Sequence, residues 1–283
     1  MSLDLDTRQR AMLLEMGVRV WWPNADRAAS EPLPQAPNAQ ASAAARLATG
    51  ADAAAPAPAV VYQPRPVDAG VAKPSPMRAQ PASPVDQMDW PELARAVHAC
   101  TACGLCEGRK APVFVGDPEP TQADWLIVGE APDEHEERAG SPFVGETGRL
   151  LDNMLRAVQC RRDGQGAGGA RLTPVVKCRP AVVRPPTMQE LTQCAVFLRR
   201  EIVLTRPRVI LAMGRFAALS LLADDYPQVL QMPLGQLRGG EFQVNGIPVV
   251  VTYHPVKLLR APHEKANAWI DLCRARKLAL GAA

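Results

Sequence analysis

The sequence predicts an α/β fold in which helices cover both faces of a mostly parallel sheet. Two observations lead to this expectation. Short runs that are apolar throughout end at turn residues, and these runs alternate with segments of helical periodicity along residues 88–283. Uniformly apolar strands are typical of a parallel sheet that is buried on both faces. No run of about 18 apolar residues occurs in the chain, so we expect no membrane-spanning helix.

The elements follow one another in the order that such a sheet needs. We expect strands at residues 125–128, 175–176, 209–213 and 247–252, and helices at residues 145–159, 187–204, 216–222 and 262–280. Ligands of open α/β sheets bind at the carboxyl ends of the strands. In this chain those ends carry Gly129-Glu130-Ala131-Pro132, Lys177-Cys178-Arg179-Pro180, Gly214-Arg215 and His254-Pro255.

The N-terminal third has a different composition from the rest. Residues 31–86 contain 17 Ala and 11 Pro among 56 residues, which is too little apolar area to offset the entropy of ordering. We therefore predict a disordered linker at 31–87, between a segment at 1–30 and a folded domain at 88–283. Residues 7–18 read as a short helix that Trp21-Trp22 follow, which favours docking to a protein partner over packing back on the domain.

Charge and cysteine content indicate the compartment. Asp4, Asp6 and Glu15 interrupt the first residues, so they do not form a secretory signal, and we expect a cytoplasmic protein. In that reducing compartment the seven cysteines are expected to ligate metal or to be buried, and not to form disulfides. The net charge of +3 permits a polyanionic partner without indicating one.

Five of the cysteines have a spacing typical of a metal site. Cys100 and Cys103 form a C-x-x-C pair, Cys106 adds a second x-x-C step, and Cys178 and Cys194 lie far downstream. Two close thiolates and two distant ones can surround one zinc ion or one iron–sulfur cluster, and the spacing does not separate the two. Cys160 and Cys273, alone in helical contexts, are instead expected to be ordinary buried cysteines.

Taken together, these segments resemble the iron–sulfur (family four) uracil-DNA glycosylases. The similarity covers about residues 100–278 and lies in ordered blocks: Cys100-Thr101-Ala102-Cys103-Gly104-Leu105, Val128-Gly129-Glu130-Ala131-Pro132, Gly140-Ser141-Pro142-Phe143-Val144-Gly145, Val175-Val176-Lys177-Cys178-Arg179-Pro180, and His254-Pro255 with Leu258-Leu259-Arg260. The resemblance implies a three-layer α/β/α fold with a small central sheet. It also implies a hydrolase that excises uracil, or a related deaminated base, from single- or double-stranded DNA.

The resemblance assigns residues to this chemistry. Cys100, Cys103, Cys178 and Cys194 would ligate a [4Fe–4S] cluster, with Cys106 left over. Glu130 and His254 would be catalytic, and Phe143, Gly129, Ala131 and Pro132 would bind the extruded base. Lys257, Leu258, Leu259 and Arg260 would contact DNA. We expect the enzyme to be a monomer that initiates base excision repair.

Three positions depart from the family pattern. Pro174 replaces the Asn whose amide reads uracil, Asp133 replaces a Gly, and Val256 replaces the Ser of His-Pro-Ser. A pocket that lacks its reading amide loses discrimination between bases. Two further readings therefore stand beside the glycosylase: a weakly active or inactive iron–sulfur DNA-binding module that is tethered to a partner, and a zinc-ribbon-like structural protein.

Overall fold

The computed structural model describes residue 15 and residues 83–115, 122–162, 166–182 and 184–281. The predictions for the N-terminal helix, for Trp21-Trp22 and for all but the last residues of the linker lie outside the described residues. The described chain begins with the 3-10 helix η2 (Pro84–Gln87), which Ser83 caps. Arg200 holds this segment on helix α5 (Met188–Thr205), because its guanidinium donates to the carbonyl oxygens of Asp86 and Met88.

A five-stranded sheet with the order β2-β1-β3-β5-β4 forms the centre of the molecule. The strands β1 (Ala123–Gly129), β2 (Gly166–Pro174), β3 (Val209–Met213) and β5 (Ile247–Thr252) are parallel, and β4 (Phe242–Val244) is antiparallel to β5. The helices α2 (Trp90–Ala99), α4 (Gly145–Ala157), α5 (Met188–Thr205), α6 (Arg215–Leu222) and α9 (Lys265–Ala279) cover its two faces. The fold class is therefore the α/β class that the sequence predicted.

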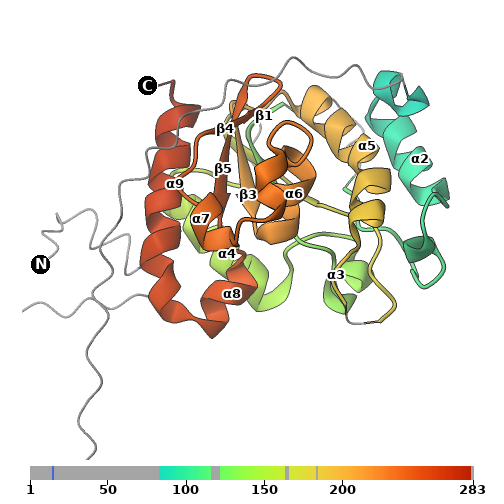
Figure 1. Ribbon diagram of the computed structural model, residues 1–283, viewed down its shortest axis with the longest axis horizontal. Helices are drawn as coiled ribbons and strands as arrows, with labels where there is room; N and C mark the ends of the chain where they lie inside the picture. Colours follow the sequence, from blue (N-terminus) through green and yellow to red (C-terminus); the bar gives the residue numbers. More distant parts are fainter. Residues whose placement is uncertain (1–14, 16–82, 116–121, 163–165, 183, 282–283) are drawn as a thin grey trace, which may run out of the picture. The chain divides into compact units, whose positions relative to one another are not determined.

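Alternate residues of β1 point into two separate hydrophobic cores. Leu126 and Val128 pack in the core beneath α2, α5 and α6, whereas Trp125 and Ile127 pack in the core beneath α4 and α9. All four side chains are buried, so β1 has two apolar faces. In Figure 1, α9 lies on one side of the strands, and α5 and α2 lie on the other. This arrangement confirms the three layers.

The predicted strand at 175–176 is wrong. The strand in this part of the chain is β2, which ends at Pro174, and residues 175–178 form bends after it. Five consecutive glycines and alanines begin β2, so it lacks the β-branched run that marks a strand in sequence. Pairing with β1 along its length decides the conformation instead. Val175 and Val176 are apolar because they are buried in the core, not because they belong to the sheet.

Several short elements were not expected from the sequence. They are α2, the 3-10 helices η3 (Gly104–Cys106), η4 (Pro227–Leu230) and η5 (Pro262–Glu264), helices α3 (Glu134–Ala139), α7 (Leu234–Leu237) and α8 (Pro255–Arg260), and β4. Asn245-Gly246, both at positive φ, form the turn between β4 and β5, and this dipeptide was the available signal for the hairpin. The four predicted helices are confirmed as α4, α5, α6 and α9, with shifts of one to three residues at their ends.

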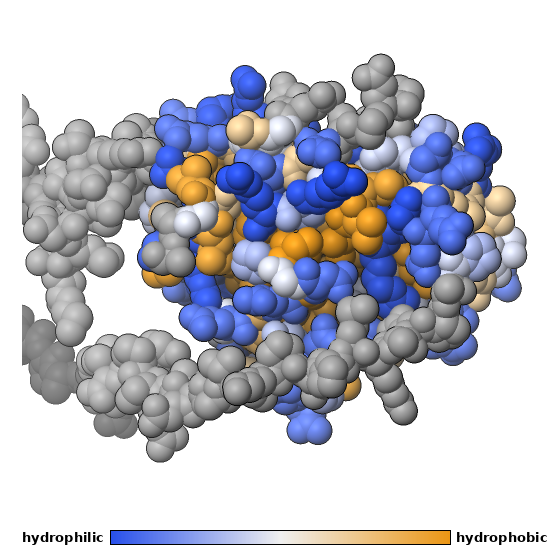
Figure 2. Space-filling model, turned by 90° about the horizontal axis from the view of Figure 1, so that it is seen from above, coloured by the Kyte–Doolittle hydropathy of each residue, from blue (hydrophilic) through white to orange (hydrophobic). Residues whose placement is uncertain are grey.

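The parallel strands end together. Gly129 of β1 is the register partner of Pro174 of β2, and Met213 of β3 is the partner of Thr252 of β5. Helices α3 and α8 follow β1 and β5, and Figure 1 shows them both at the lower end of the sheet. Figure 2 views the opposite end, where apolar residues lie among hydrophilic ones. The carboxyl edge therefore brings the predicted site residues to one end of the molecule.

Candidate active site and cysteine cavity

Two predicted site residues from distant parts of the chain are in contact at the carboxyl edge. The rings of Phe143 and His254 stack, with centroids 5.2 Å apart and planes inclined by 24°. Phe143 lies just before α4, and His254 is the residue at which α8 begins. Phe143 is 1% exposed, so both faces of its ring are covered. The structure thus joins the third and the last of the sequence blocks.

Gly129 forms the wall against which Phe143 packs. A Cβ atom at Gly129 would lie 2.5 Å from Cζ of Phe143, well inside van der Waals contact. Any side chain at position 129 would push the ring away from its present place. The close approach of the Phe143 ring therefore requires glycine at the end of β1.

His254 is neutral and presents one N–H donor. Burial lowers the pKa of His254 to about 4, although the negative charge of Asp133 acts in the opposite direction. Its Nδ1 accepts a hydrogen bond of 3.4 Å from the backbone N–H of Val256. Because Nδ1 is the acceptor, we assign the proton of the neutral imidazole to Nε2.

Glu130 follows β1 directly and caps α6. Its Oε1 accepts a 3.1 Å hydrogen bond from the N–H of Phe216. Burial raises the pKa of Glu130 to about 7, while hydrogen bonds from Phe216 and Arg215 act in the opposite direction. Gly214 has φ +111°, and a Cβ there would overlap the carboxylate. The pocket therefore contains a carboxylic acid that ionises near neutral pH.

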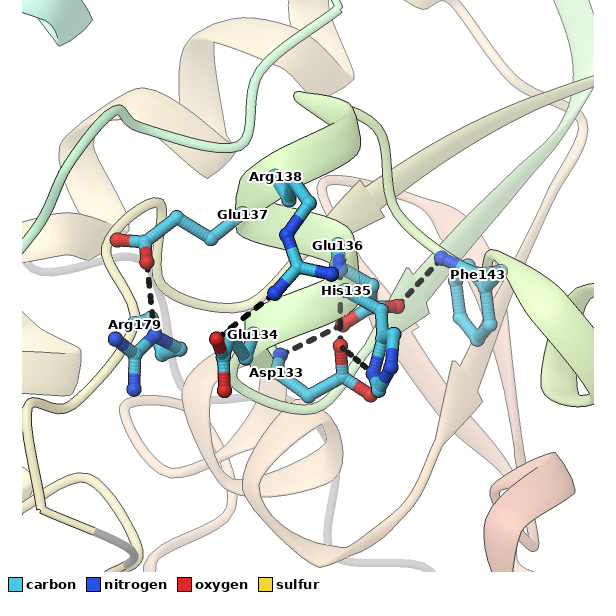
Figure 3. Close-up of polar contacts among 8 residues, drawn as sticks. All are labelled: Asp133, Glu134, His135, Glu136, Glu137, Arg138, Phe143 and Arg179. Atoms are coloured by element: carbon cyan, nitrogen blue, oxygen red, sulfur yellow. Dashed lines mark hydrogen bonds and ion pairs between the residues drawn. The ribbon is translucent and has the colours of Figure 1, made fainter.

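Asp133 begins α3, which Figure 3 shows with its polar contacts. The Asp133 carboxylate accepts from the N–H of Glu136, and Glu136 in return accepts from the N–H of Asp133, both at 2.9 Å. This reciprocal pair is a capping box. The departure from the family pattern at this position thus has a structural role, as the N-cap residue of α3.

Glu136 and Arg162 are pocket residues that sequence reasoning missed. Oε1 of Glu136 accepts from the N–H of Phe143 at 2.5 Å, and Arg162 donates to the carbonyl oxygen of Phe143 at 3.1 Å. The spacing Asp133-x-x-Glu136 was a readable capping-box signal for the start of α3. Nothing in the sequence connected Arg162 with Phe143.

The end of β5 is supported by a buried polar network that the sequence did not indicate. Arg238 pairs with Asp271 at 2.7 Å, and the hydroxyl of Thr252 donates to the same carboxylate at 2.8 Å. The guanidinium of Arg238 also lies 4.7 Å from the ring centroid of Tyr253, the residue before His254. These contacts fix the strand end from which His254 projects.

The remaining predicted base-binding and DNA-contacting residues differ in exposure. Pro132 is buried, and Ala131 packs against the core beneath α2, α5 and α6. On α8, Lys257 and Arg260 are exposed, and Leu259 is 41% exposed. Leu258 is fully buried in the core beneath α4 and α9, so it does not reach the surface. Of the two leucines, Leu259 alone is available to a ligand in this structure.

Pro174 lies beside the pocket wall. It is the register partner of Gly129, and its carbonyl oxygen accepts from Nζ of Lys177 at 3.1 Å. Lys177 is itself fully buried and pairs with Glu201 at 2.5 Å. A longer polar side chain at position 174 would therefore project from β2, the strand next to β1, whose Gly129 contacts the Phe143 ring.

Five cysteines line one cavity on the other side of α3. Cys100, Cys103, Cys106, Cys178 and Cys194 surround it together with Arg109 and Lys177. Arg109 donates to Sγ of Cys178 at 3.0 Å, and the N–H of Lys177 donates to Sγ of Cys194 at 3.4 Å.

These donors and the two cationic side chains suit sulfur ligands that carry negative charge. Within the described ranges, no group of three or more Cys, His, Asp or Glu is arranged to hold a metal ion. The other two cysteines lie elsewhere. Cys160 is buried beneath α4 and α9 as expected, although it follows α4 and is not part of a helix. The expectation of burial is wrong for Cys273, because it lies on the solvent-facing side of α9 and is exposed.

Comparison with known proteins gives consistent matches. The family model of the uracil DNA glycosylase superfamily matches residues 115–275. A type-4 uracil-DNA glycosylase of Pyrobaculum aerophilum is 36% identical over 189 residues, which are 65% of this chain and 92% of the relative.

Two further relatives have the same name. The type-4 uracil-DNA glycosylase of Thermotoga maritima is 36% identical over 169 residues, which are 59% of this chain and 82% of the relative. That of Archaeoglobus fulgidus is 32% identical over 173 residues, which are 60% of this chain and 83% of the relative. In the part of the chain that the structure describes, no helix is long and apolar enough to span a membrane.

Proposed function

The chain belongs to the uracil DNA glycosylase superfamily, among the type-4 enzymes, and on that premise we propose that it excises uracil or a related deaminated base from DNA. The reaction is hydrolysis of the N-glycosidic bond, the first step of base excision repair. The observation that carries the proposal is the stacked pair of Phe143 and His254 at the carboxyl edge of the sheet, where Glu130 follows β1. An aromatic face, a neutral N–H donor and an ionisable carboxylate are the groups that this reaction needs.

Base binding includes an opening of the pocket. The target nucleotide leaves the DNA stack at a cost of a few kcal/mol, which the enzyme offsets by contacts to the extruded base. The Phe143 ring supplies the stacking surface, but in the closed structure His254 covers one of its faces. Phe143 is held from both ends of its backbone, whereas His254 has one 3.4 Å bond to Val256, so the movement is assigned to His254.

His254 stabilises the leaving base. Cleavage leaves negative charge on the uracil ring, and Nε2–H of the neutral imidazole is placed to donate to the carbonyl oxygen that gathers it. The low pKa of His254 keeps the ring neutral at pH 7, so it acts by donating a hydrogen bond and not as a cation. Stacking on the Phe143 ring and the hydrogen bond from His254 together hold the base while the glycosidic bond breaks.

Glu130 acts on the sugar side. When ionised, its carboxylate stabilises the developing oxocarbenium charge or orients the attacking water. Because burial raises the pKa of Glu130 to about 7, the carboxylate ionises near neutral pH. The hydrogen bonds from the backbone N–H groups of Phe216 and Arg215 fix the position of the carboxylate.

Exposed residues of α8 contact the DNA. Lys257 and Arg260 are assigned to phosphate, and Leu259 is assigned to the gap that the extruded base leaves in the stack. The basic residues make binding depend on salt. Leu258 does not contact DNA, because its side chain is buried in the core.

Four thiolates of the cavity are assigned to a [4Fe–4S] cluster. The proposed ligands are Cys100, Cys103, Cys178 and Cys194, with Cys106 as an additional thiol. Clustered sulfurs with N–H donors from Arg109 and Lys177 fit this group. Bound there, the cluster would cross-link the two cysteine loops to α5 and take no part in bond cleavage. Such a thiol set requires a reducing compartment, which supports the cytoplasm, and we retain the monomer and the N-terminal protein partner as proposals.

Pro174 favours one alternative function. Proline has no side-chain amide or backbone N–H to read the edge of uracil, and it lies beside the pocket wall. A catalytically weak DNA-binding module would keep the fold and the cysteine cavity but would lack this reader. The two functions differ in one measurable property, which is excision.

The deciding experiment is excision from uracil-containing single-stranded and duplex oligonucleotides, read as alkali-labile strand cleavage. We expect cleavage by the wild type and a loss of at least about 100-fold in His254→Ala, because one donor to the developing charge is removed. Pro174→Asn restores an amide beside the base and is expected to raise the preference for uracil.

Two results would contradict the proposal in different ways. If the wild type is silent and Pro174→Asn cleaves, the scaffold is a glycosylase that has lost its base reader. If both are silent while DNA binding persists, the DNA-binding module is the correct reading.

A further inference from the structure

Phe143 has a backbone conformation that aromatic residues rarely adopt. Its φ is +56°, in the left-handed region that favours glycine. Such a conformation persists only where the surroundings hold it. The ring points toward His254 and Gly129 because the backbone turns here, so whatever stabilises the turn also sets the orientation of the ring.

Two charged side chains hold the two peptide groups of Phe143. Glu136 accepts the N–H at 2.5 Å, and Arg162 donates to the carbonyl oxygen at 3.1 Å. Arg162 is anchored by an ion pair of 2.6 Å to Asp152 on α4 and by a bond to the carbonyl oxygen of Gly148. Glu136 in turn belongs to the capping box of α3. The turn is thus fixed between two helices.

We propose that Glu136 is a positioning residue for base recognition, which acts by holding the left-handed backbone of Phe143 and thereby the ring that stacks on the base. The inference rests on the proposed function in one respect, that Phe143 stacks on the excised base. Glu136 itself does not touch the base, because both of its oxygens are engaged, one with Phe143 and one with Asp133.

The neighbouring carboxylates of α3 show why Glu136 is singled out. Glu134 is exposed and pairs with Arg138 one turn along the same helix. Glu137 is buried and faces the cysteine loops, where it accepts from the N–H of Lys110 and from Arg179, both at 2.9 Å. Figure 3 shows the three side chains pointing in different directions from α3, and only Glu136 meets Phe143.

The first test is a double-mutant cycle on kcat/KM for uracil excision. Glu136→Ala is expected to lower kcat/KM roughly 10- to 100-fold, because small misplacements of a contacting group have effects of this size. In the Phe143→Ala background the same change is expected to lower it less than about 3-fold, since the ring that Glu136 positions is gone. Glu134→Ala, on the same helix, is the matched control and should stay within about 2-fold of the wild type.

The second test needs no activity. The four histidines of the chain give four ring signals in an NMR titration of the cluster-containing protein. In the wild type the pKa of His254 is expected near 4. In Glu136→Ala the Phe143 ring no longer covers the imidazole, so hydration should raise this pKa by about one unit or more. Removal of a negative charge alone would lower the pKa of a histidine, so the direction distinguishes the two effects.

The outcomes separate this inference from the proposed function. An equal loss of kcat/KM in both backgrounds, or an unchanged His254 pKa, would overturn the role of Glu136. Absence of excision by the wild type would overturn the proposed function, and the titration would still test the positioning. If Glu136→Ala fails to fold, Glu136→Gln replaces it in both tests. It keeps one acceptor oxygen, so it is expected between wild type and alanine, and a loss of activity without a rise in the His254 pKa would contradict the proposal.

Discussion

The cysteine cavity and the Phe143–His254 pocket lie against different cores of the same sheet. Cys178 and Cys194 pack in the core beneath α2, α5 and α6, whereas Phe143 belongs to the core beneath α4 and α9. The cavity gathers thiols from two loops and a helix around space that a ligand would fill. The pocket is already closed, with ring against ring and ring against glycine. One region thus encloses a cavity lined by thiols, and the other is organised by its own packing.

Helix α3 lies between the two regions and contacts both. Glu137 binds the loops that carry Cys106 and Cys178, through the N–H of Lys110 and through Arg179. Glu136 binds Phe143. A six-residue helix therefore connects the cysteine cavity, where we propose a cluster, with the Phe143–His254 pocket. A substitution in the Phe143–His254 pocket can therefore disturb it directly, and a substitution in the cysteine cavity can disturb it through α3.

Loss of a proposed ligand has the largest expected effect. Cys100→Ser or Cys178→Ser should abolish the roughly 400 nm absorbance of a bound cluster and lower the free energy of unfolding by roughly 3 kcal/mol or more. Cys273→Ser, on the exposed face of α9, is the control and should retain both. The measurements are absorption spectra, iron content and denaturant unfolding. Full absorbance in both ligand variants would show that the ligand assignment is wrong.

A change in the pocket alone should leave the cavity intact. In Gly129→Ala the new Cβ would stand 2.5 Å from Cζ of Phe143, so the ring must move. We expect kcat/KM for excision to fall about 100-fold while iron content and absorbance stay at wild-type levels. Gly104→Ala is the control, because a Cβ at that position meets nothing within 4 Å. Loss of the cluster in Gly129→Ala would mean that the two regions are not separable.

The smallest expected effect is a pair of opposite pH dependences in stability. The pKa of Glu130 is about 7 when folded, above its ordinary value of 4.5, so its contribution to stability is lost as the pH rises from about 4.5 through 7. The pKa of His254 is about 4 when folded, below its ordinary value of 6.5, so stability is lost as the pH falls from about 6.5 through 4. In the wild type these two slopes largely cancel.

Replacing one of the two residues removes its contribution, so that the pH dependence of stability due to the other can be measured. In Glu130→Gln the free energy of unfolding should rise with pH between about 4.5 and 6.5, by up to about 1 kcal/mol per unit. In His254→Ala it should fall over the same range. Denaturant unfolding at a series of pH values measures both. Identical pH profiles in the two variants would contradict the burial of these groups in the folded protein.

Much of the fold was predictable because its signals are local. The apolar runs of β1, β3 and β5 and the helical patterns of α4, α5, α6 and α9 each lie within a few consecutive residues. β2 was missed because its conformation depends on its partner β1 and not on its own glycine-rich residues. α3 and α8 are short, so their periodicity is weak, and only a capping signal could have marked them.

The candidate site was predictable in its members and not in its geometry. The motif blocks contain Glu130, Phe143 and His254, and the C-x-x-C spacing identifies the first cysteines. The burial of Leu258 beside the exposed Leu259 follows from the way α8 sits on its core, which no motif states. The contact of Arg162 with Phe143 spans 19 residues and an entire helix.

By itself, the sequence determined the layers, the helices and strands with strong periodicity, the cysteines of the cavity and the residue types at the strand ends. These are properties of spacing and polarity along the chain. The tertiary structure alone decided that Phe143 stacks on His254, that burial raises the pKa of Glu130 and lowers that of His254, and that Glu136 binds the backbone of Phe143. Each of these depends on desolvation and on contacts between segments distant in sequence, and both arise only when the chain has folded.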